Sequence, residues 1–274
     1  MLYLVGTPIG NLKDISLRAI EILSSVSLIA CEDTRTTGLL LRGLGIEAKL
    51  MSYHEHNKAM RGESLIRMLS EGADVALVTD AGMPCISDPG YDLVKLCIEN
   101  DIDVTVVPGP VAAITALVMS GLDTRRYHYE GFLASEGKER KTRLAALKDV
   151  RVTIVLYEAP HRLLKTIDDL VEAGFGDCEV AFCRELTKRY EQVIRTKVCD
   201  ARALFEEVAP KGEFVICLEP LPEPELEKLG EDKLDEMIRA YKNQGLSTKE
   251  IVSKLADSTD MNKKELYTYI AHML

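Results

Sequence analysis

The chain has 274 residues, of which 34 are Lys or Arg and 44 are Asp or Glu, so its formal net charge is −10. Hydrophobic residues make up 46% and charged residues 28% of the sequence. This balance is typical of globular proteins that bury a core, and it excludes a mostly disordered, collagen-like or coiled-coil chain. The acidic excess disfavours indiscriminate binding of nucleic acid, but a local basic patch can still bind it.

The apolar runs and the cysteines together favour a cytoplasmic protein. The most apolar stretch, residues 111–119, is much shorter than the ~20 residues that a membrane helix needs. Glycine and proline at Gly6, Pro8 and Gly10 interrupt the first apolar run, so we expect no secretory signal. The seven cysteines include no C-x-x-C spacing, which predicts neither a disulfide framework nor a zinc ribbon. We therefore expect reduced thiols, no membrane association and no metal.

Residues 1–121 alternate short apolar runs with helical patterns. The runs that predict strands are residues 2–5, 27–30, 75–78 and 102–107. Residues 15–26 have apolar side chains near the helical spacing, and Gly or Pro lies within four residues after the strand patterns 2–5, 75–78 and 102–107. Strands that alternate with helices predict an α/β domain with a mostly parallel sheet and helices on both faces.

A second alternating set begins near residue 129, so we place a domain boundary between residues 121 and 132. The second α/β domain then covers residues 122–220. Its strand patterns are residues 152–157, 179–183, 191–198 and 214–218, and its clearest helical pattern is residues 162–173. The two domains together predict an α/β protein with two sheets.

The last part of the sequence predicts a linker and a small helical module. Residues 221–229 alternate Pro and Glu, which is typical of a stiff, solvated linker. Residues 230–274 contain helix signals only. Ser247 with Glu250, and Asn262 with Glu265, have the spacing of capping boxes. We predict three short helices that resemble a helix-turn-helix module.

Ligands of open α/β sheets bind at the carboxyl ends of the strands, so the loops there are the candidates for a site. Residues 6–12 have neither the dinucleotide glycine spacing nor a P-loop lysine, and they form either a binding loop or a plain turn. Residues 80–90 hold two Asp, two Gly and two Pro, which favours a binding loop. Residues 108–110, Pro-Gly-Pro, open a helix whose small side chains allow a ligand to come close.

Charged clusters follow three further strands, at residues 31–36, 157–162 and 184–188. Structural ion pairing explains each cluster alone, but their common place at strand ends favours one shared cleft. His54 and His56 lie two residues apart, and no other His or Cys has the spacing that a metal site needs.

One segment departs from the acidic balance of the chain. Residues 124–151 contain eight basic and four acidic side chains, and the densest part is residues 137–143. Such a patch suits a phosphate backbone. A solvated helix face with a Glu139–Arg143 pair explains the same pattern equally well.

In combination, these motifs resemble the ribosomal RNA small subunit methyltransferase I family of the tetrapyrrole-methylase superfamily. The matching segments follow the family's order up to about residue 220, and the helical tail is similar to the family's C-terminal module. They are residues 6–12, 32–35, 54–57, 80–84, 86–90, 108–110, 137–140, 157–162, 184–188 and 211–214. One departure is Ala134-Ser135, where the family commonly has Pro and a basic residue.

The resemblance implies an S-adenosylmethionine-dependent 2′-O-methyltransferase that acts on cytidine-1402 of 16S rRNA in the small ribosomal subunit. It also implies a homodimer whose cofactor lies in a cleft between two α/β domains. By superfamily analogy, the first domain binds the cofactor through Pro8, Ile9, Asp80, Gly82, Met83, Pro84, Val111 and Ala112. The second domain binds it through Tyr157, Leu186 and Gly212.

The implied reaction needs help at the ribose, because a ribose hydroxyl is a poor acid. We hypothesise that the base is Glu32, Asp33 or Glu158, and the sequence does not choose among them. Arg35 or Arg184 would hold the adjacent phosphate or polarise the nucleophile. The candidate RNA contacts are the basic residues of the patch, Lys138, Arg140, Lys141 and Arg143.

Two other functions remain open at this point. A tetrapyrrole or other small-molecule methyltransferase would share the cofactor loops, but it would need a flat apolar cleft and no basic patch. A DNA-binding regulator would use the helical tail. Residues 221–274 carry eight basic and eleven acidic side chains, which opposes a DNA partner and favours a docking or packing module.

Overall fold

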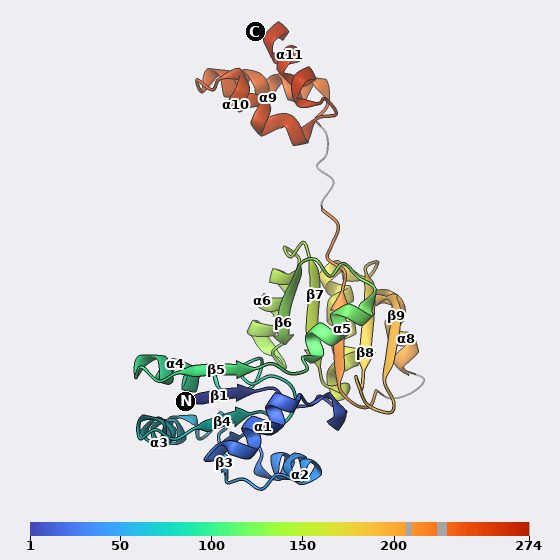
Figure 1. Cartoon of the computed structure of the whole chain (residues 1–274). Helices are drawn as coiled ribbons and strands as arrows, with labels where there is room; N and C mark the ends of the chain where they lie inside the picture. The colour runs from blue at the N-terminus through green and yellow to red at the C-terminus, as the bar shows by residue number, and fades with distance from the viewer. Residues whose placement is uncertain (207–209, 224–228, 274) are drawn as a thin grey trace. The chain divides into compact units, whose positions relative to one another are not determined.

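The computed structural model describes residues 1–206, 210–223 and 229–273, without the side chain of Asp257. The chain divides into two compact units, Met1–Leu221 and Pro222–Leu274, and the larger unit contains two β-sheets (Figure 1). Residues 224–228 of the predicted linker lie outside the described residues.

The first sheet has five parallel strands in the order β3-β2-β4-β1-β5. The strands are β1 (Leu2–Val5), β2 (Leu28–Cys31), β3 (Leu50–Ser52), β4 (Val75–Val78) and β5 (Val104–Val107). β2 and β4 are buried along their whole length, as expected of central strands with helices on both faces. The predicted parallel sheet is confirmed.

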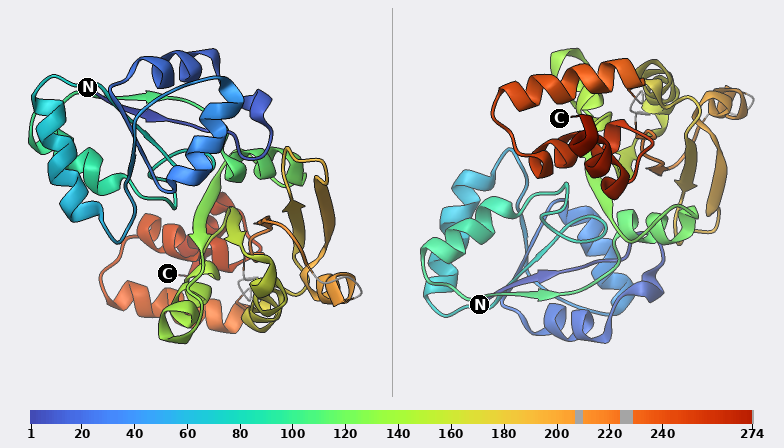
Figure 2. Two further views of the ribbon diagram at one scale, coloured as in Figure 1. Left: turned by 90° about the horizontal axis from the view of Figure 1, so that it is seen from below. Right: turned by 90° about the horizontal axis from the view of Figure 1, so that it is seen from above.

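Helices cover both faces of the first sheet (Figure 2). They are α1 (Leu17–Ser25), α2 (Thr34–Leu44), α3 (Lys58–Ser70) and α4 (Tyr91–Glu99), and a 3₁₀ turn, η1 (Leu12–Asp14), precedes α1. Leu23 of α1 and Leu41 of α2 pack with Val5 on one face. Leu65 of α3 and Leu93 of α4 share the other face with Leu2 and Leu4. Alternate residues of β1 therefore serve opposite faces.

The second sheet is mixed and has the order β6-β7-β10-β8-β9. Its strands are β6 (Tyr127–Phe132), β7 (Thr153–Glu158), β8 (Glu179–Arg184), β9 (Gln192–Lys197) and β10 (Phe214–Leu218). β6 and β7 are parallel, and the other three pairs are antiparallel. The sequence patterns located β7, β8, β9 and β10 but not β6, and they did not predict the strand directions, because alternating apolar residues do not determine which strands pair.

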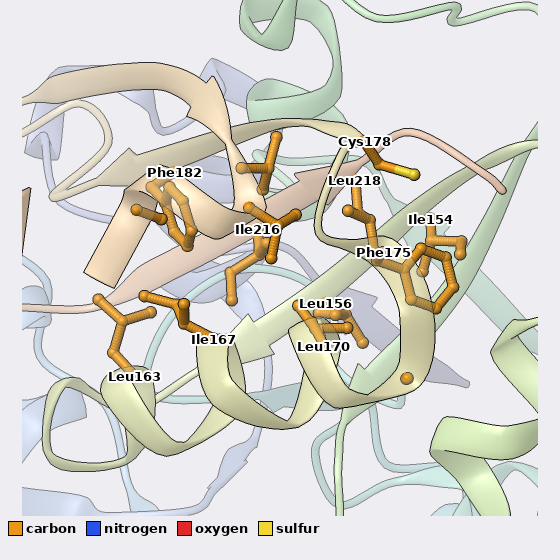
Figure 3. Close-up of a cluster of buried hydrophobic side chains, with 14 of the residues drawn as sticks. Ile154, Leu156, Leu163, Ile167, Leu170, Phe175, Cys178, Phe182, Ile216 and Leu218 are labelled. Carbon is orange, nitrogen blue, oxygen red and sulfur yellow. The ribbon is translucent and has the colours of Figure 1, made fainter. Parts of the chain in front are cut away.

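Three helices cover one face of the second sheet, and its core lies beneath them. The helical segments are α6 (Gly137–Leu147), η2 (Pro160–Arg162), α7 (Leu163–Leu170), the π-helical turn η3 (Val171–Phe175) and α8 (Val198–Glu206). Figure 3 shows Ile167 and Leu170 of α7 packed against Leu156 and Ile216. All four side chains are at most 1% exposed.

The helix α5 (Ala112–Ser120) joins the two sheets into one compact unit. It follows β5 of the first sheet but lies across the second sheet (Figure 1), where Ala116 and Leu117 pack with Val155 and Cys217. This packing explains the apolar residues on the buried face of α5, whereas Ile114 and Val118 on its other side are exposed. Within the described ranges, no helix has both the length and the apolar character to cross a membrane.

The smaller unit is a three-helix module. Its helices are α9 (Glu231–Asn243), α10 (Thr248–Leu255) and α11 (Lys263–Met273), with a 3₁₀ turn, η4 (Ala256–Ser258), between the last two. Both capping boxes are confirmed. Ser247 N–H donates to Glu250 Oε2 at 2.8 Å, and Asn262 N–H donates to Glu265 Oε2 at 3.0 Å. Each cap oxygen accepts in return from the backbone N–H of its glutamate.

Candidate active site

The loops that follow β1, β4 and β5 meet closely at the carboxyl ends of these strands. A Cβ atom on Gly6 would lie 2.7 Å from the Cα of Gly109, so only glycine fits this crossing. Thr7 N–H donates to Gly82 O at 2.9 Å, and Gly82 N–H donates to Thr7 O at 3.2 Å. The three loops therefore form one continuous wall.

A cavity of about 370 Å³ lies between this wall and the second sheet, within the usual range for small-molecule sites. Eight of the eleven predicted cofactor residues line it. From the first half of the chain they are Ile9, Asp80, Gly82, Met83, Val111 and Ala112. From the second half they are Tyr157 and Leu186. The structure thus brings residues that are far apart in sequence to one cavity.

The other three predicted cofactor residues, Pro8, Pro84 and Gly212, each stand beside a residue of the cavity wall. Gly212 has a φ of +82°, and a Cβ there would lie 2.5 Å from the Oε1 of Glu185. Its neighbour Glu213 does line the cavity. Gly212 therefore leaves room for the Glu185 side chain beside the wall, and its positive φ favours glycine.

Sequence reasoning assigned no role to several residues that line the cavity. Ser87 and Asp88 come from the loop after β4, Phe132 from the end of β6, and Cys183 from β8. Ser87 and Asp88 belong to the quoted motif of residues 86–90, which was a signal that could have placed them at the site. No comparable signal marks Phe132 or Cys183.

A second, more open basin of about 500 Å³ adjoins the cavity at Asp80, which lines both. Its walls are polar and include Glu32, Ser52, His54 and His56. One oxygen of Asp80 accepts a hydrogen bond from the backbone N–H of Asp33 at 3.2 Å. This bond fixes the loops after β2 and β4 to each other. We call this space the polar basin.

Asp33 and Arg35 form a local pair at the start of α2. The Oδ1 of Asp33 accepts from the Arg35 backbone N–H at 2.8 Å, and its Oδ2 lies 2.6 Å from the Arg35 guanidinium. Hydrogen bonding to the Arg35 guanidinium, more than any other contact, lowers the pKa of Asp33 to about 2. The side chain of Arg35 is 88% exposed. Asp33 is therefore a helix cap and a weak base.

Glu32 differs from Asp33 although the two are neighbours. Burial, and then the charge of Asp80, raise the pKa of Glu32 above its ordinary value. Glu32 also faces the polar basin. Of these two neighbours, Glu32 is therefore the one whose pKa is raised, and Asp33 the one whose pKa is lowered.

Glu158 lies at the end of β7 and lines the cavity, but both of its carboxylate oxygens are engaged. Oε1 accepts from Ala159 N–H at 2.9 Å and lies 3.2 Å from the Nε of Arg162. Oε2 accepts from the hydroxyl of Thr166 at 2.5 Å. With its side chain 1% exposed, Glu158 is a structural carboxylate, which argues against the predicted role as a base.

Arg184 lies at the end of β8, where its Nε donates to Lys211 O at 2.6 Å. Among the described residues, it lines neither the cavity nor the polar basin. The structure therefore gives Arg184 a contact that holds the segment before β10.

The cavity wall carries acidic side chains, and its remaining lining is mainly apolar. Asp80, Asp88, Glu158 and Glu213 contribute carboxyl groups, and none of the described lining residues is Lys, Arg or His. Burial, followed by the charges of Glu32 and Asp80, raises the pKa of Asp88 to about 7. An apolar space with a negative wall suits an organic cation.

Two arginines of the predicted RNA patch point into the protein. Arg140 is 4% exposed, lies 2.6 Å from Asp169, and donates to Ala134 O at 2.9 Å. This buried, paired guanidinium argues against the predicted RNA contact of Arg140. Arg143 donates to Glu130 Oε1 at 2.5 Å and to Phe132 O at 2.6 Å, in place of the expected pair with Glu139.

Arg162 completes this arrangement by donating to Leu133 O at 2.6 Å. We call Arg140, Arg143 and Arg162 the arginine clamp, because together they bind carbonyls of residues 132–134. Phe132, at the start of this segment, lines the cavity. Of the four predicted RNA contacts, Lys138 and Lys141 are exposed.

The histidines beside the polar basin form no metal centre with other residues. Asn57 Nδ2 lies 3.1 Å from His54 Nε2, and Asn57 Oδ1 accepts from the His54 backbone N–H at 2.9 Å. Within the described part of the chain, no group of three or more His, Cys, Asp or Glu is placed to hold a metal ion. Asn57 thus fixes the position of the His54 ring.

The chain is similar to known proteins over most of its length. The family of tetrapyrrole (corrin/porphyrin) methylases matches residues 1–202. A ribosomal RNA small subunit methyltransferase I from Synechocystis sp. is 43% identical over 267 residues, which cover 97% of this chain and 96% of that protein. The chain belongs to the ribosomal RNA small subunit methyltransferase I family. A relative of the same name from Bacillus subtilis is 42% identical, over 97% of this chain and 92% of that protein. Another, from Escherichia coli O157:H7, is 43% identical, over 98% of this chain and 93% of that protein.

Solved structures show that the family has the tetrapyrrole-methylase fold, as predicted. A cobalt precorrin-4 methyltransferase of cobalamin biosynthesis matches with a TM-score of 0.60 and 19% identity, over 79% of this chain and 93% of that one. A uroporphyrin-III-C-methyltransferase from Thermus thermophilus matches with a TM-score of 0.58 and 22% identity, over the same shares. Members of the ribosomal RNA family and the tetrapyrrole enzymes therefore share one architecture of two α/β halves.

Proposed function

We propose that this chain transfers a methyl group from S-adenosylmethionine to the ribose 2′-oxygen of cytidine-1402 in 16S rRNA. The observation that carries the proposal is the 43% identity, over 97% of the chain, to a protein named as a ribosomal RNA small subunit methyltransferase I. The target nucleotide and the 2′ position come from the family resemblance of the sequence motifs.

The cavity fits the methyl donor by its chemistry. S-adenosylmethionine supplies an activated methyl group on a sulfonium cation. Ile9, Val111 and Leu186 offer apolar surface to the nucleoside, and the carboxyl groups of the wall favour the positive charge. Asp80 lines both the cavity and the polar basin, so it would lie where the methyl donor meets the acceptor ribose. The residues that hold the cofactor are then the eight predicted ones that line the cavity.

The polar basin would admit the acceptor ribose. Glu32 and Asp80 can accept hydrogen bonds from hydroxyl groups, and His54 is held beside them by Asn57. Because the methyl donor is already activated, most of the protein's task is to place the ribose oxygen correctly. Glu32 remains a candidate proton acceptor, whereas Asp33 and Glu158 are occupied by their partners.

The exposed surface near the site would contact the rest of the RNA. Lys138 and Lys141 lie on α6, which follows the segment held by the arginine clamp. Arg35 is exposed at the polar basin and can approach a flanking phosphate. RNA in a folded ribosomal subunit is read largely through its shape and backbone, which these cations suit. The partner is then the small ribosomal subunit, in the cytoplasm.

We also propose that the protein acts as a homodimer, as the resemblance implies. Ile114 and Val118 of α5 are 39% and 71% exposed, and Val106 of β5 is 44% exposed. Such apolar side chains favour a surface that a second copy covers. Sedimentation of the full chain would give the mass of a dimer, and a monomer at all concentrations would contradict this part.

The alternative of a tetrapyrrole methyltransferase shares the fold but is less well supported. Porphyrinoid substrates carry several carboxylates, and the carboxyl groups of the cavity wall would repel them. Relatives that match this chain over nearly its full length carry the ribosomal name. A DNA-binding regulator gains no support from the acidic C-terminal module.

The test is methyl transfer from labelled S-adenosylmethionine to small ribosomal subunits that lack the endogenous modification, with the label mapped to the nucleotide. We expect one 2′-O-methyl group, on cytidine-1402. Calorimetry of cofactor binding serves as the control for a folded site. Cofactor binding without transfer to RNA would overturn the rRNA substrate, and the absence of binding would overturn the cofactor.

A further inference from the structure

Two large apolar side chains at the cavity, Ile86 and Phe132, have no ligand in the proposed function. Ile86 comes from the loop after β4 and Phe132 from the end of β6. They are 44% and 47% exposed, whereas Ile9 and Leu186, which are assigned to the cofactor, are 8% and 6% exposed. Ile86 and Phe132 therefore mark the open mouth of the cavity. Large apolar side chains that stay exposed beside a cavity point to a ligand contact.

A β-bulge in β6 brings Phe132 to the cavity side of the second sheet. Tyr129 pairs with Val155 and Phe132 pairs with Tyr157, which leaves one extra residue in β6 between the two pairs. Val155 and Tyr157 are two residues apart and face the same side, so their partners do too. Without the extra residue, Tyr129 and Phe132 would point to opposite faces. Bulges are over-represented beside active sites, where they re-aim a side chain.

A hydrogen bond holds the two sides of the mouth together. Ser87 Oγ lies 2.7 Å from the hydroxyl of Tyr129. A Cβ atom on Gly131, whose φ is +69°, would lie 3.0 Å from the same Ser87 oxygen. Ser87 is next to Ile86 in the sequence, and Gly131 is next to Phe132. The mouth is therefore built from two segments that touch each other, so it is already formed in the free protein.

Phe132 is fixed at its backbone and at its ring. Arg143 of the arginine clamp donates to Phe132 O at 2.6 Å. The rings of Phe132 and Tyr157 meet edge to face, with centroids 5.3 Å apart and an interplanar angle of 63°. The hydroxyl of Tyr157 accepts in turn from Ala113 N–H at 3.1 Å. These contacts hold the ring in one orientation and, with 47% of Phe132 exposed, leave ring surface open to a ligand.

The chemistry of the mouth suits a flat, uncharged ring. None of the described residues that line the cavity is Lys, Arg or His, so a phosphate would gain no ion pair there. Unstacked bases of RNA bind to proteins by stacking on aromatic side chains. Asp80 lines both the cavity and the polar basin, so the base and the ribose of one nucleotide can occupy the two spaces together.

We propose that Ile86 and Phe132 form a slot for the base of the acceptor nucleotide, which stacks on the ring of Phe132. We call these two residues the base slot. This inference rests on the proposed function and adds a base contact to it. Enzymes that act on a nucleotide within folded nucleic acid take it out of its stack, which costs stacking energy. Stacking on Phe132 would replace part of that energy.

A first experiment measures filter binding of small ribosomal subunits that lack the modification, with S-adenosylhomocysteine present. F132A removes the stacking surface, so we expect the affinity for the subunits to fall about 5- to 100-fold. F132Y keeps the ring and should stay within about threefold of wild type. The control Y127A removes an aromatic side chain of the same strand that is 44% exposed and does not line the cavity, so it should match wild type.

Two further variants separate stacking from simple apolar contact. F132L keeps apolar bulk without a flat ring, so it should lose affinity as F132A does. I86A opens the other side of the slot and should lose about 3- to 10-fold, whereas the control I98A, at an exposed residue of α4, should lose nothing. Wild-type affinity in both F132A and F132L would overturn the proposal.

Other occupants of the slot would give different results. Calorimetry should show that F132A changes the affinity for S-adenosylmethionine by less than about threefold. A loss as large as the loss for subunits would assign Phe132 to the donor's adenine and overturn the proposal. So would sedimentation of F132A with a smaller mass than wild type, which would assign the ring to a contact between two copies of the chain.

Failure of the proposed function would appear differently, in the methylation assay. Wild type that binds the subunits but forms no 2′-O-methyl group would overturn the proposed reaction. The binding comparison of wild type, F132A and Y127A would still decide the base slot, because it requires no methyl transfer.

Discussion

Two walls of the same cavity use charged residues in opposite ways. On the segment after β6, the arginine clamp binds the carbonyls of residues 132–134, so its positive charges are satisfied inside the protein. On the loop after β4, Asp88 faces the cavity and has no partner among the described residues, and Asp80 accepts a hydrogen bond from one backbone N–H. The first wall uses charge to fix a shape, and the second leaves charge available to ligands.

This difference offers a way to separate structural from functional charges in this fold. A satisfied buried ion gains little for stability overall, but it is costly to break because its partner stays buried. An unsatisfied carboxyl costs stability while no ligand is bound, so it persists where a ligand uses it. The sequence alone did not separate the two kinds of charge, because it assigned both Arg140 of the clamp and Asp80 of the loop after β4 to ligand binding.

The largest effect should come from breaking the arginine clamp. R140M removes the partner of Asp169 and the donor to Ala134 O, so we expect the free energy of unfolding to fall by about 3 kcal/mol. Asp169 is 23% exposed, which places the loss at the low end for a broken buried pair. Denaturant unfolding followed by circular dichroism measures it. The control K141M, on an exposed residue of the same helix, should stay within about 0.5 kcal/mol of wild type.

The double variant R140M/D169N sharpens this prediction. It removes the charge that R140M leaves without a partner, so part of the lost stability should return. If R140M unfolded at the same denaturant concentration as wild type, Arg140 would not hold the segment after β6. In that case its burial would need a different explanation.

A smaller effect is expected from the lysines of α6, which lie outside the clamp. K138A/K141A should leave stability and cofactor affinity unchanged and weaken binding of the small ribosomal subunit. If each lysine meets one phosphate, the slope of log affinity against log salt should become shallower by about 2. Filter binding at several salt concentrations measures this slope, with K148A, at the other end of the helix, as the control. An unchanged slope would assign both lysines to a solvated helix face.

Much of the fold could be predicted from the sequence, because its strongest signals are local. The parallel strands β1, β2 and β4 are short apolar runs that end at polar or glycine-containing loops, and the capping box at Ser247 is a fixed spacing of two residues. Strand direction in the second sheet depends on which strands pair. That choice is made by tertiary contacts, which no local pattern records.

The site was predicted in part for the same reason. Loop motifs located most of the cavity wall, because glycine and proline reveal where the backbone comes close. The burial of Arg140 depends on Asp169, which is 29 residues away in the sequence. The importance of Asp88 depends on the absence of a partner among the described residues, and a sequence does not show absences of that kind.

The smallest expected effect is on the pH dependence of stability. It compares Asp33, which is paired with Arg35, with Asp88, which has no partner among the described residues. Pairing with Arg35 lowers the pKa of Asp33 to about 2, so its charge stabilises the folded state above the ordinary aspartate pKa of about 3.9. This contribution is lost as the pH falls towards 2. Asn caps a helix as well as Asp does, so D33N isolates the charge. The stability difference between wild type and D33N should therefore be constant at neutral pH and shrink on acidification.

Asp88 should show the opposite sign in the same thermal unfolding series. Its pKa is raised to about 7, so wild type loses stability relative to D88N as the pH rises from about 4 to about 7. Added salt should weaken the Asp33 effect more, because that pair is close to solvent. If both variants followed the same pH trend, the distinction between a paired and an unpaired carboxylate would not hold at this site. Opposite trends would show that the loops at the carboxyl end of the first sheet carry both a structural charge, after β2, and a charge available to a ligand, after β4.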